Sequence, residues 1–75
     1  MVRLPVVSGR DAVRAFTSVG YEVDRQRGSH IVLRQTRLPH RRLVIPDHTE
    51  IARGTLRALI REAGMSVEAF VEVLR

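Results

Sequence analysis

Near the start of the chain, the apolar residues recur at the spacing of a helix. Those that fall on one side of a helical turn are Ala12, Val13, Phe16 and Val19. Ser8 precedes them and can accept a hydrogen bond from the backbone of Asp11, which can reach back to Ser8, while Gly20 follows as a left-handed stop. The pattern predicts a capped helix over residues 9–19.

After Gly20 the apolar residues recur at every second position, which is typical of β-strands. Clusters of turn-forming residues interrupt this alternation twice, the second time around Pro39, and the last apolar run stops at Pro46. The predicted strands cover about residues 21–24, 30–34 and 41–46, with turns at 25–29 and 36–40. Strands joined by such short turns are expected to pair as an antiparallel meander.

The helical period returns in the last third of the chain. One helix is predicted from about Ala52 to a terminating Gly64, and Ser66 caps a final short helix that carries Glu68 in its first turn. A helix, three strands and two helices in 75 residues predict a single α+β domain over residues 1–75. Because the sheet has one apolar face to bury, we expect the helices to cover that face and leave the other to solvent.

Strand parity predicts which side chains lie on each face of the sheet. The covered face should carry Tyr21, Val23, Ile31, Leu33, Leu43 and Ile45, and the open face His30, Val32, Arg34, Arg42, Val44 and Pro46. A second hairpin that pivots near Leu38 pairs Arg34 with Arg42, Val32 with Val44 and His30 with Pro46. His48 then falls on the same face as His30, at the roughly 7–8 Å of a diagonal neighbour.

The charge of the chain favours a polyanionic partner. The formal net charge is +5, and all 13 basic residues are arginine, which grips phosphate with two hydrogen bonds. A GC-rich coding sequence would equally account for the absence of lysine. The arginines are spread from Arg3 to Arg75, which indicates a structured basic surface rather than a basic tail.

Other compositional features exclude several kinds of protein. Without cysteine the chain has neither a disulfide framework nor a thiolate metal site. The apolar runs are too short for a membrane span or a secretory signal, so we expect a cytoplasmic protein.

The segment Arg27-Gly28-Ser29-His30 is a candidate site for phosphate binding and proton transfer. It combines an arginine, a glycine turn with free amides, a hydroxyl and an imidazole at the start of a strand. The alternative is an ordinary hairpin turn with a half-exposed histidine.

With its flanking elements, this segment resembles the HicA toxin family, the small mRNA interferases of toxin–antitoxin modules. The resemblance runs from about Ser8 to Leu74. Its most specific pieces are Gly28-Ser29-His30, Gly54-Thr55-Leu56-Arg57 and Ala63-Gly64, in the family's order. Two features depart from the family: Arg27 stands where lysine is common, and the loop over residues 35–40 is irregular.

The resemblance implies a fold like that of double-stranded-RNA-binding domains, with mRNA as the substrate of a type II toxin and a HicB-like antitoxin as its protein partner. The histidine of the family's Gly-Ser-His motif is catalytic, and this role carries over onto His30. Neither a cofactor nor a metal is implied.

Cleavage of RNA without a metal needs a base for the 2′-hydroxyl, an acid for the leaving 5′-oxygen and positive charge at the phosphate. Imidazole titrates near neutral pH and suits both proton transfers. His48 either supplies a second imidazole, as the similar Pro-x-His of the family suggests, or caps the turn beside Asp47. The residues expected to bind RNA are Arg27, Gly28, Ser29, Arg34, Arg42, Arg53 and Arg57.

Arg53, Arg57 and Arg61 recur every four residues and form a stripe on the predicted second helix. They either follow an RNA backbone or form an ordinary solvated helix face. His40 lies in the second turn, where it is a solvated loop residue or an RNA contact, and the hairpin geometry opposes a metal site built from all three histidines.

Two other functions fit the same residues. One is a nucleic-acid-binding module without catalysis, in which His30 only contacts phosphate. The other is a protein-interaction subunit whose basic surface docks an acidic antitoxin.

Overall fold

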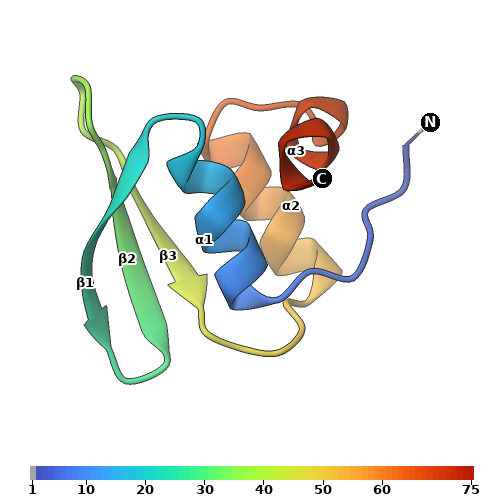
Figure 1. Cartoon of the computed structure of the whole chain (residues 1–75), viewed down its shortest axis with the longest axis horizontal. Coiled ribbons are helices and arrows are strands. Elements are labelled where there is room, and N and C mark those ends of the chain that lie inside the picture. The colour runs from blue at the N-terminus through green and yellow to red at the C-terminus, as the bar shows by residue number, and fades with distance from the viewer. Residues whose placement is uncertain (1) are drawn as a thin grey trace.

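The computed structural model describes residues 2–75 and shows six elements in the predicted order (Figure 1). They are α1 (Gly9–Thr17), β1 (Tyr21–Arg27), β2 (His30–Gln35), β3 (Arg42–Pro46), α2 (Arg53–Glu62) and α3 (Val67–Leu74). The three strands form one antiparallel sheet in the order β1-β2-β3. This arrangement confirms the predicted α+β fold of the double-stranded-RNA-binding-domain type.

Two of the three helices begin with the predicted side-chain caps. The hydroxyl of Ser8 accepts a hydrogen bond from the amide of Asp11 at 3.0 Å, and that of Ser66 accepts one from the amide of Ala69 at 3.0 Å. Hydrogen bonding of the Asp11 carboxylate, first by the Ser8 side chain and then by Arg14, lowers the pKa of Asp11. In contrast, α2 follows Ala52, and no side chain within residues 2–75 caps it.

The register between β2 and β3 confirms the predicted pivot at the second hairpin. The paired residues are His30 with Pro46, Ile31 with Ile45, Val32 with Val44, Leu33 with Leu43 and Arg34 with Arg42. The alternation of buried and more exposed side chains along both strands follows the predicted parity.

The predicted first turn over residues 25–29 is wrong, because β1 continues as far as Arg27. The turn consists of Gly28 and Ser29 alone, and Gly28 has a φ of 55°, since two-residue hairpin turns require a positive φ at their first position. Pairing with β2 satisfies the backbone of the added residues, which sequence composition alone had assigned to a loop. A bulge between Val23 and Arg25 interrupts the register of β1.

Val23 is the one strand residue predicted to be in the core that the structure leaves exposed. Its exposed fraction is 53%, although its partner Leu33 on β2 is fully buried. β1 is an edge strand, and Tyr21 is its only buried residue. Parity therefore identified the correct face, but the helices do not extend far enough to cover it at this edge.

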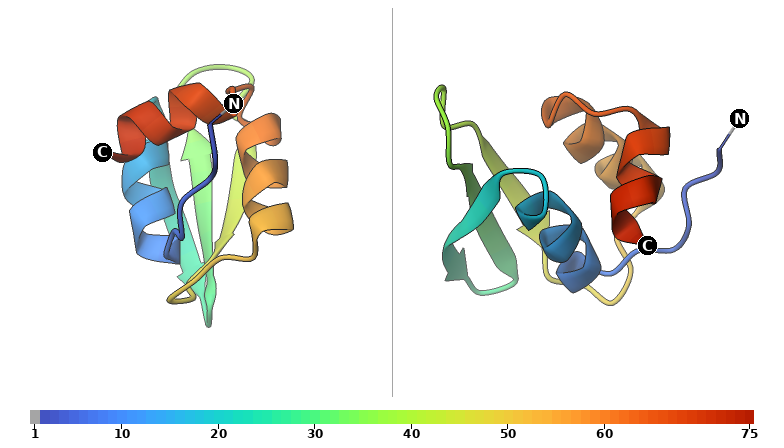
Figure 2. Two further views of the ribbon diagram at one scale, coloured as in Figure 1. Left: turned by 90° about the vertical axis from the view of Figure 1, so that its right-hand side faces the viewer. Right: turned by 45° about the horizontal axis from the view of Figure 1, so that its top comes forward.

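The helices pack on one face of the sheet only, as predicted (Figure 2). In the left view of that figure, α1 and α2 lie side by side over the sheet and α3 crosses one end of the pair. Phe16 occupies the centre of this core, 5.2 Å from the ring of Phe70 and 6.0 Å from the ring of Tyr21. Each of these aromatic rings is buried, so none is available to stack on bases.

The predicted helix boundaries differ from the structure by one or two residues. α1 ends at Thr17, and Gly20 then adopts a φ of 108° that redirects the chain into β1. α2 ends at Glu62, shortly before Gly64 with a φ of 73°. Of the residues described, no helix is both long and apolar enough to cross a membrane.

Candidate active site

His30 lies at the first position of β2, next to the Gly28-Ser29 turn. Its side chain is exposed, whereas the following residue, Ile31, is buried beneath the helices. Since successive side chains of a strand point to opposite faces, His30 belongs to the open face of the sheet, as predicted. The imidazole is thus presented to solvent on the face that no helix covers.

Arg27 is the register partner of His30 across the turn. Directly opposite residues in an antiparallel pair have Cβ atoms about 4.5–5.5 Å apart, so the two side chains start as close neighbours on the open face. Among residues 2–75, no salt bridge engages Arg27 or the nearby Arg25. An approaching phosphate would therefore meet these guanidinium groups without displacing a carboxylate.

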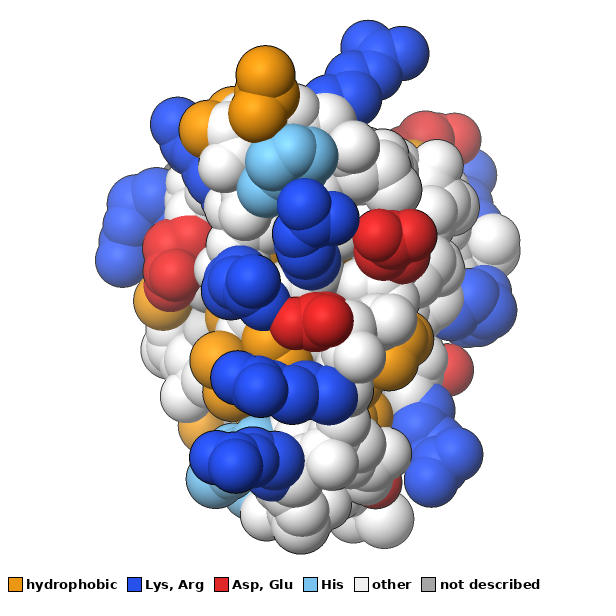
Figure 3. Space-filling model, turned by 90° about the vertical axis from the view of Figure 1, so that its left-hand side faces the viewer, with side chains coloured by type: hydrophobic (Ala, Val, Ile, Leu, Met, Phe, Trp, Pro, Cys, Tyr) orange, Lys and Arg blue, Asp and Glu red, His pale blue; other side chains and the backbone are white. Residues whose placement is uncertain are grey.

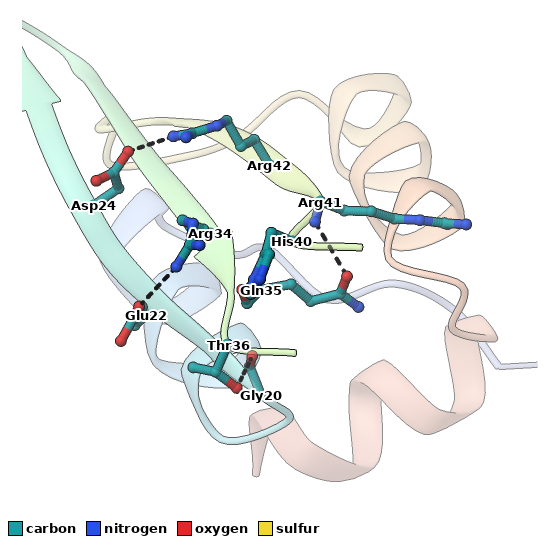
Figure 4. Close-up of polar contacts among 9 residues, drawn as sticks. All are labelled: Gly20, Glu22, Asp24, Arg34, Gln35, Thr36, His40, Arg41 and Arg42. Atoms are coloured by element: carbon teal, nitrogen blue, oxygen red, sulfur yellow. Dashed lines mark hydrogen bonds and ion pairs between the residues drawn. The ribbon is translucent and has the colours of Figure 1, made fainter. Parts of the chain in front are cut away.

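Arg34 and Arg42, the other cations predicted on this face, are already paired with acids of β1. The guanidinium of Arg34 lies 3.6 Å from the carboxylate of Glu22, and Arg42 donates a hydrogen bond to Asp24 (Figure 4). Both pairs cross between strands on the solvent side, so each is a weak interaction that a phosphate can exchange. These acidic partners were not predicted from the sequence, although their alternation with Tyr21 and Val23 places them on the open face.

The charge of the open face consequently differs along its length. Basic side chains gather on it with acidic ones between them (Figure 3). Around Arg34 and Arg42 the acids of β1 compensate the positive charge, whereas Arg25 and Arg27 at the Gly28-Ser29 end keep theirs. The imidazole of His30 lies at that uncompensated end.

His48 lies beyond β3, which ends at Pro46. One more backbone hydrogen bond, from the amide of Asp47 to the carbonyl of Ser29 at 2.7 Å, extends the pairing, and the carbonyl of His48 then accepts from the amide of Gly9 at 2.8 Å. The chain therefore turns toward α1 at His48, where strand parity no longer applies. Its side chain is exposed, and its placement beside His30 stays a prediction.

His40 occupies the loop at the opposite end of β2. It is half-buried, has a φ of 59°, and its Nδ1 lies 3.0 Å from the carbonyl oxygen of Gln35 (Figure 4). Beside it, a depression of about 390 Å³ is lined by Val19, Gly20, Gln35, Thr36 and Arg37. Within residues 2–75, no three histidine or acidic side chains are grouped as a metal site would require.

The arginine stripe of α2 belongs to the helix layer and not to the open face. Arg53, Arg57 and Arg61 are exposed, but α2 packs on the opposite side of the sheet from His30. The start of α2 lies at the same end of the molecule as the Gly28-Ser29 turn (Figure 1). Arg53 is therefore the stripe residue nearest that end, and Arg61 is the most remote.

Asp47 is a polar residue of this region that the sequence pattern indicated only as a turn former. Its carboxylate accepts a hydrogen bond from Gln26 at 3.2 Å and lies 3.5 Å from the guanidinium of Arg10. Both partners are distant in sequence, so the spacing of residues carried no signal for these interactions.

Two comparisons with known proteins bear on the family of the chain. None of the curated proteins matches the chain. A family model for the HicA toxin of bacterial toxin–antitoxin systems matches residues 9–65, which span most of the chain and include the Gly28-Ser29 turn, His30, all three strands and α2. The chain therefore belongs to the HicA toxin family.

Proposed function

We propose that this toxin is a metal-independent endoribonuclease that cleaves mRNA with His30 as its catalytic base. One observation carries the proposal: the exposed His30 lies directly across the strand pair from Arg27, on the uncovered face of the sheet. Arg27 forms no salt bridge within residues 2–75. Catalytic groups for a polymeric substrate must be accessible from solvent, and a sheet of this size offers such access only on its open face.

The reaction uses the 2′-hydroxyl of the substrate as the nucleophile. His30 removes the hydroxyl proton, the 2′-oxygen bonds to phosphorus, and the bond from phosphorus to the 5′-oxygen breaks. The leaving 5′-oxygen takes up a proton from an acid, for which His48 is the candidate, and a 2′,3′-cyclic phosphate remains. DNA lacks the 2′-hydroxyl, so the activity is expected to be specific for RNA.

Arg27 stabilises the phosphate as negative charge develops on it. A cation held beside the reacting phosphate contributes most where it already lies in place and carries no competing partner. Arg34 and Arg42 would contribute only after a phosphate displaces the carboxylates of Glu22 and Asp24. We therefore expect them to contribute less to RNA binding than Arg27.

As the toxin of a toxin–antitoxin module, the protein has an antitoxin partner. We propose a HicB-like antitoxin with an acidic surface that covers the open face of the sheet. Such a partner would replace the phosphate at Arg27 and block the approach of RNA to His30.

The decisive variant is His30→Ala, with His40→Ala as its matched control. The first removes the exposed imidazole of the open face, and the second removes one at the opposite end of β2. All cleavage assays contain EDTA. We expect His30→Ala to fold, to cut no RNA and to relieve growth arrest, whereas His40→Ala cuts RNA like the parent. RNA cleavage by His30→Ala at the parent rate would disprove the assignment, and salt-dependent binding by the parent with no cleavage would favour the binding module instead.

A further inference from the structure

Asp47 joins three segments of the chain around the turn that precedes His30. Its carboxylate accepts a hydrogen bond from Nε2 of Gln26 on β1 at 3.2 Å and lies 3.5 Å from Nε of Arg10 on α1. Its backbone amide donates to the carbonyl of Ser29 at 2.7 Å. One residue thus contacts the first helix, the end of the first strand and the turn itself.

Gln26 connects Asp47 to the turn. Its Nε2 also donates to the carbonyl of Gly28 at 3.1 Å. A side-chain amide carries two N–H groups, so Gln26 can serve the turn and the Asp47 carboxylate together. Both residues of the turn are therefore held through their carbonyl oxygens, Gly28 by the Gln26 side chain and Ser29 by the Asp47 backbone.

The segment that carries Asp47 is itself fixed against α1. The amide of Gly9 donates to the carbonyl of His48 at 2.8 Å. A Cβ at Gly9 would lie 2.2 Å from the carbonyl oxygen of Pro46, so only glycine permits this approach of helix and strand. Asp47 lies between Pro46 and His48, which both contact Gly9, and its side chain is only 20% exposed.

We propose that Asp47 is a positioning residue, which acts through Gln26 and the Gly28-Ser29 turn to fix His30 relative to Arg27. The proposal rests on the function proposed above. Gly28 allows the turn many conformations, and a two-residue turn without external support leaves the adjoining side chains free to shift. A displacement of 1 Å in a catalytic group lowers a rate by up to about 100-fold.

The test compares Asp47→Ala with Glu72→Ala, because an asparagine at position 47 would keep an oxygen that accepts from Gln26. Both substitutions remove one carboxylate, but Glu72 lies on α3 and, within residues 2–75, pairs only with Arg75. We expect Asp47→Ala to lower kcat about tenfold with little change in KM, because the variant misaligns His30 and does not weaken RNA binding. Glu72→Ala should retain the parent kcat. A purely structural role would instead lower the melting temperature and leave the kcat of the folded fraction unchanged.

A double-mutant cycle tests whether Asp47 acts through Gln26. If one hydrogen-bonded network positions the turn, Gln26→Ala and Asp47→Ala together should lower kcat no further than the stronger single variant. Multiplicative effects of the two substitutions would show that they act separately and would overturn this part of the proposal.

NMR gives a readout that does not depend on cleavage. In Asp47→Ala, the amide signals of Gly28, Ser29 and His30 should shift or broaden, whereas those of α3 stay in place. If these signals and kcat both match those of Glu72→Ala, the positioning role is wrong and the catalytic assignment of His30 is unaffected. If His30→Ala cleaves RNA normally, the proposed function fails, and the NMR comparison still decides whether Asp47 orders the turn.

Discussion

The two ends of β2 carry the same kinds of residue and differ in how the histidine is engaged. At the first end, His30 is exposed and faces Arg27, which has no salt bridge in residues 2–75. At the other end, His40 is half-buried and its Nδ1 lies 3.0 Å from the backbone of Gln35. The two histidines therefore differ in exposure, and the ring of His40 is tied to the backbone at the end of β2.

The backbone explains why the two ends differ. The Gly28-Ser29 turn is as short as a hairpin permits and is supported from outside by Gln26 and Asp47. The loop between β2 and β3 is longer, and polar side chains, including His40 in the loop and Gln35 at the end of β2, satisfy backbone groups there. Side chains that stabilise a loop in this way are not available for a substrate.

The largest effect is expected from the arginines at the two ends. Arg27→Ala should lower kcat/KM for RNA cleavage by about 100-fold, because it removes a positioned cation from the reacting phosphate. Arg37→Ala, the matched change in the loop at the other end, should lower it severalfold at most. Initial rates on a single RNA oligonucleotide measure both variants. Equal losses would mean that the two ends contribute alike, and the comparison would fail.

A smaller effect is expected between the two ends, where the acids of β1 compensate Arg34 and Arg42. The double variant Glu22→Gln, Asp24→Asn should bind RNA severalfold more tightly, because it frees both guanidinium groups. The dependence of log K on log salt should steepen by about 0.7 for each additional phosphate that the freed arginines neutralise.

Binding of that variant is measured in a His30→Ala background, so that the RNA remains intact. Glu72→Gln together with Glu68→Gln, which remove two charges from α3, serve as the matched control. An equal rise in affinity for the control would attribute the effect to net charge and not to the ion pairs of the open face.

At the loop end, His40→Ala should change stability and not activity. Loss of the hydrogen bond to the Gln35 carbonyl is expected to lower the free energy of unfolding by about 1 kcal/mol. For a chain of this size, that corresponds to a fall of roughly 4–8 °C in melting temperature. Thermal denaturation measures it, with Arg37→Ala as the control in the same loop. A loss of cleavage without a loss of stability would instead place His40 in the site.

The smallest effect concerns Asp11 at the start of α1. Hydrogen bonding of its carboxylate by the Ser8 side chain lowers the pKa of Asp11 in the folded state, so the folded protein loses this proton more readily than the unfolded chain. The resulting stabilisation is present above the ordinary pKa of 3.8 and is lost as pH falls through the lower folded-state pKa. Asp11→Asn should therefore be less stable than the parent at neutral pH, with the difference vanishing in acid. Urea titrations across this range test the sign.

The sequence predicted the open-face position of His30 because that position follows from local rules. Alternating burial around Ile31 and the pivot near Leu38 fixed the face and the register of β2 and β3. The extent of β1 was harder to predict, since Arg25, Gln26 and Arg27 have no apolar alternation and join the sheet only through backbone pairing. The exposure of Val23 depended on how far the helices reach across the sheet.

The amino-acid sequence by itself determined the order of the elements, the faces that β2 and β3 bury, and the family to which the chain belongs. These properties depend on periodicity, caps and turn residues within a few positions of one another. Only the tertiary structure decided which arginines are compensated and which residues hold the turn before His30. Glu22 reaches Arg34, Asp24 reaches Arg42, and Asp47 reaches Gln26 across the folded chain, so those interactions exist only after the sheet and α1 have packed.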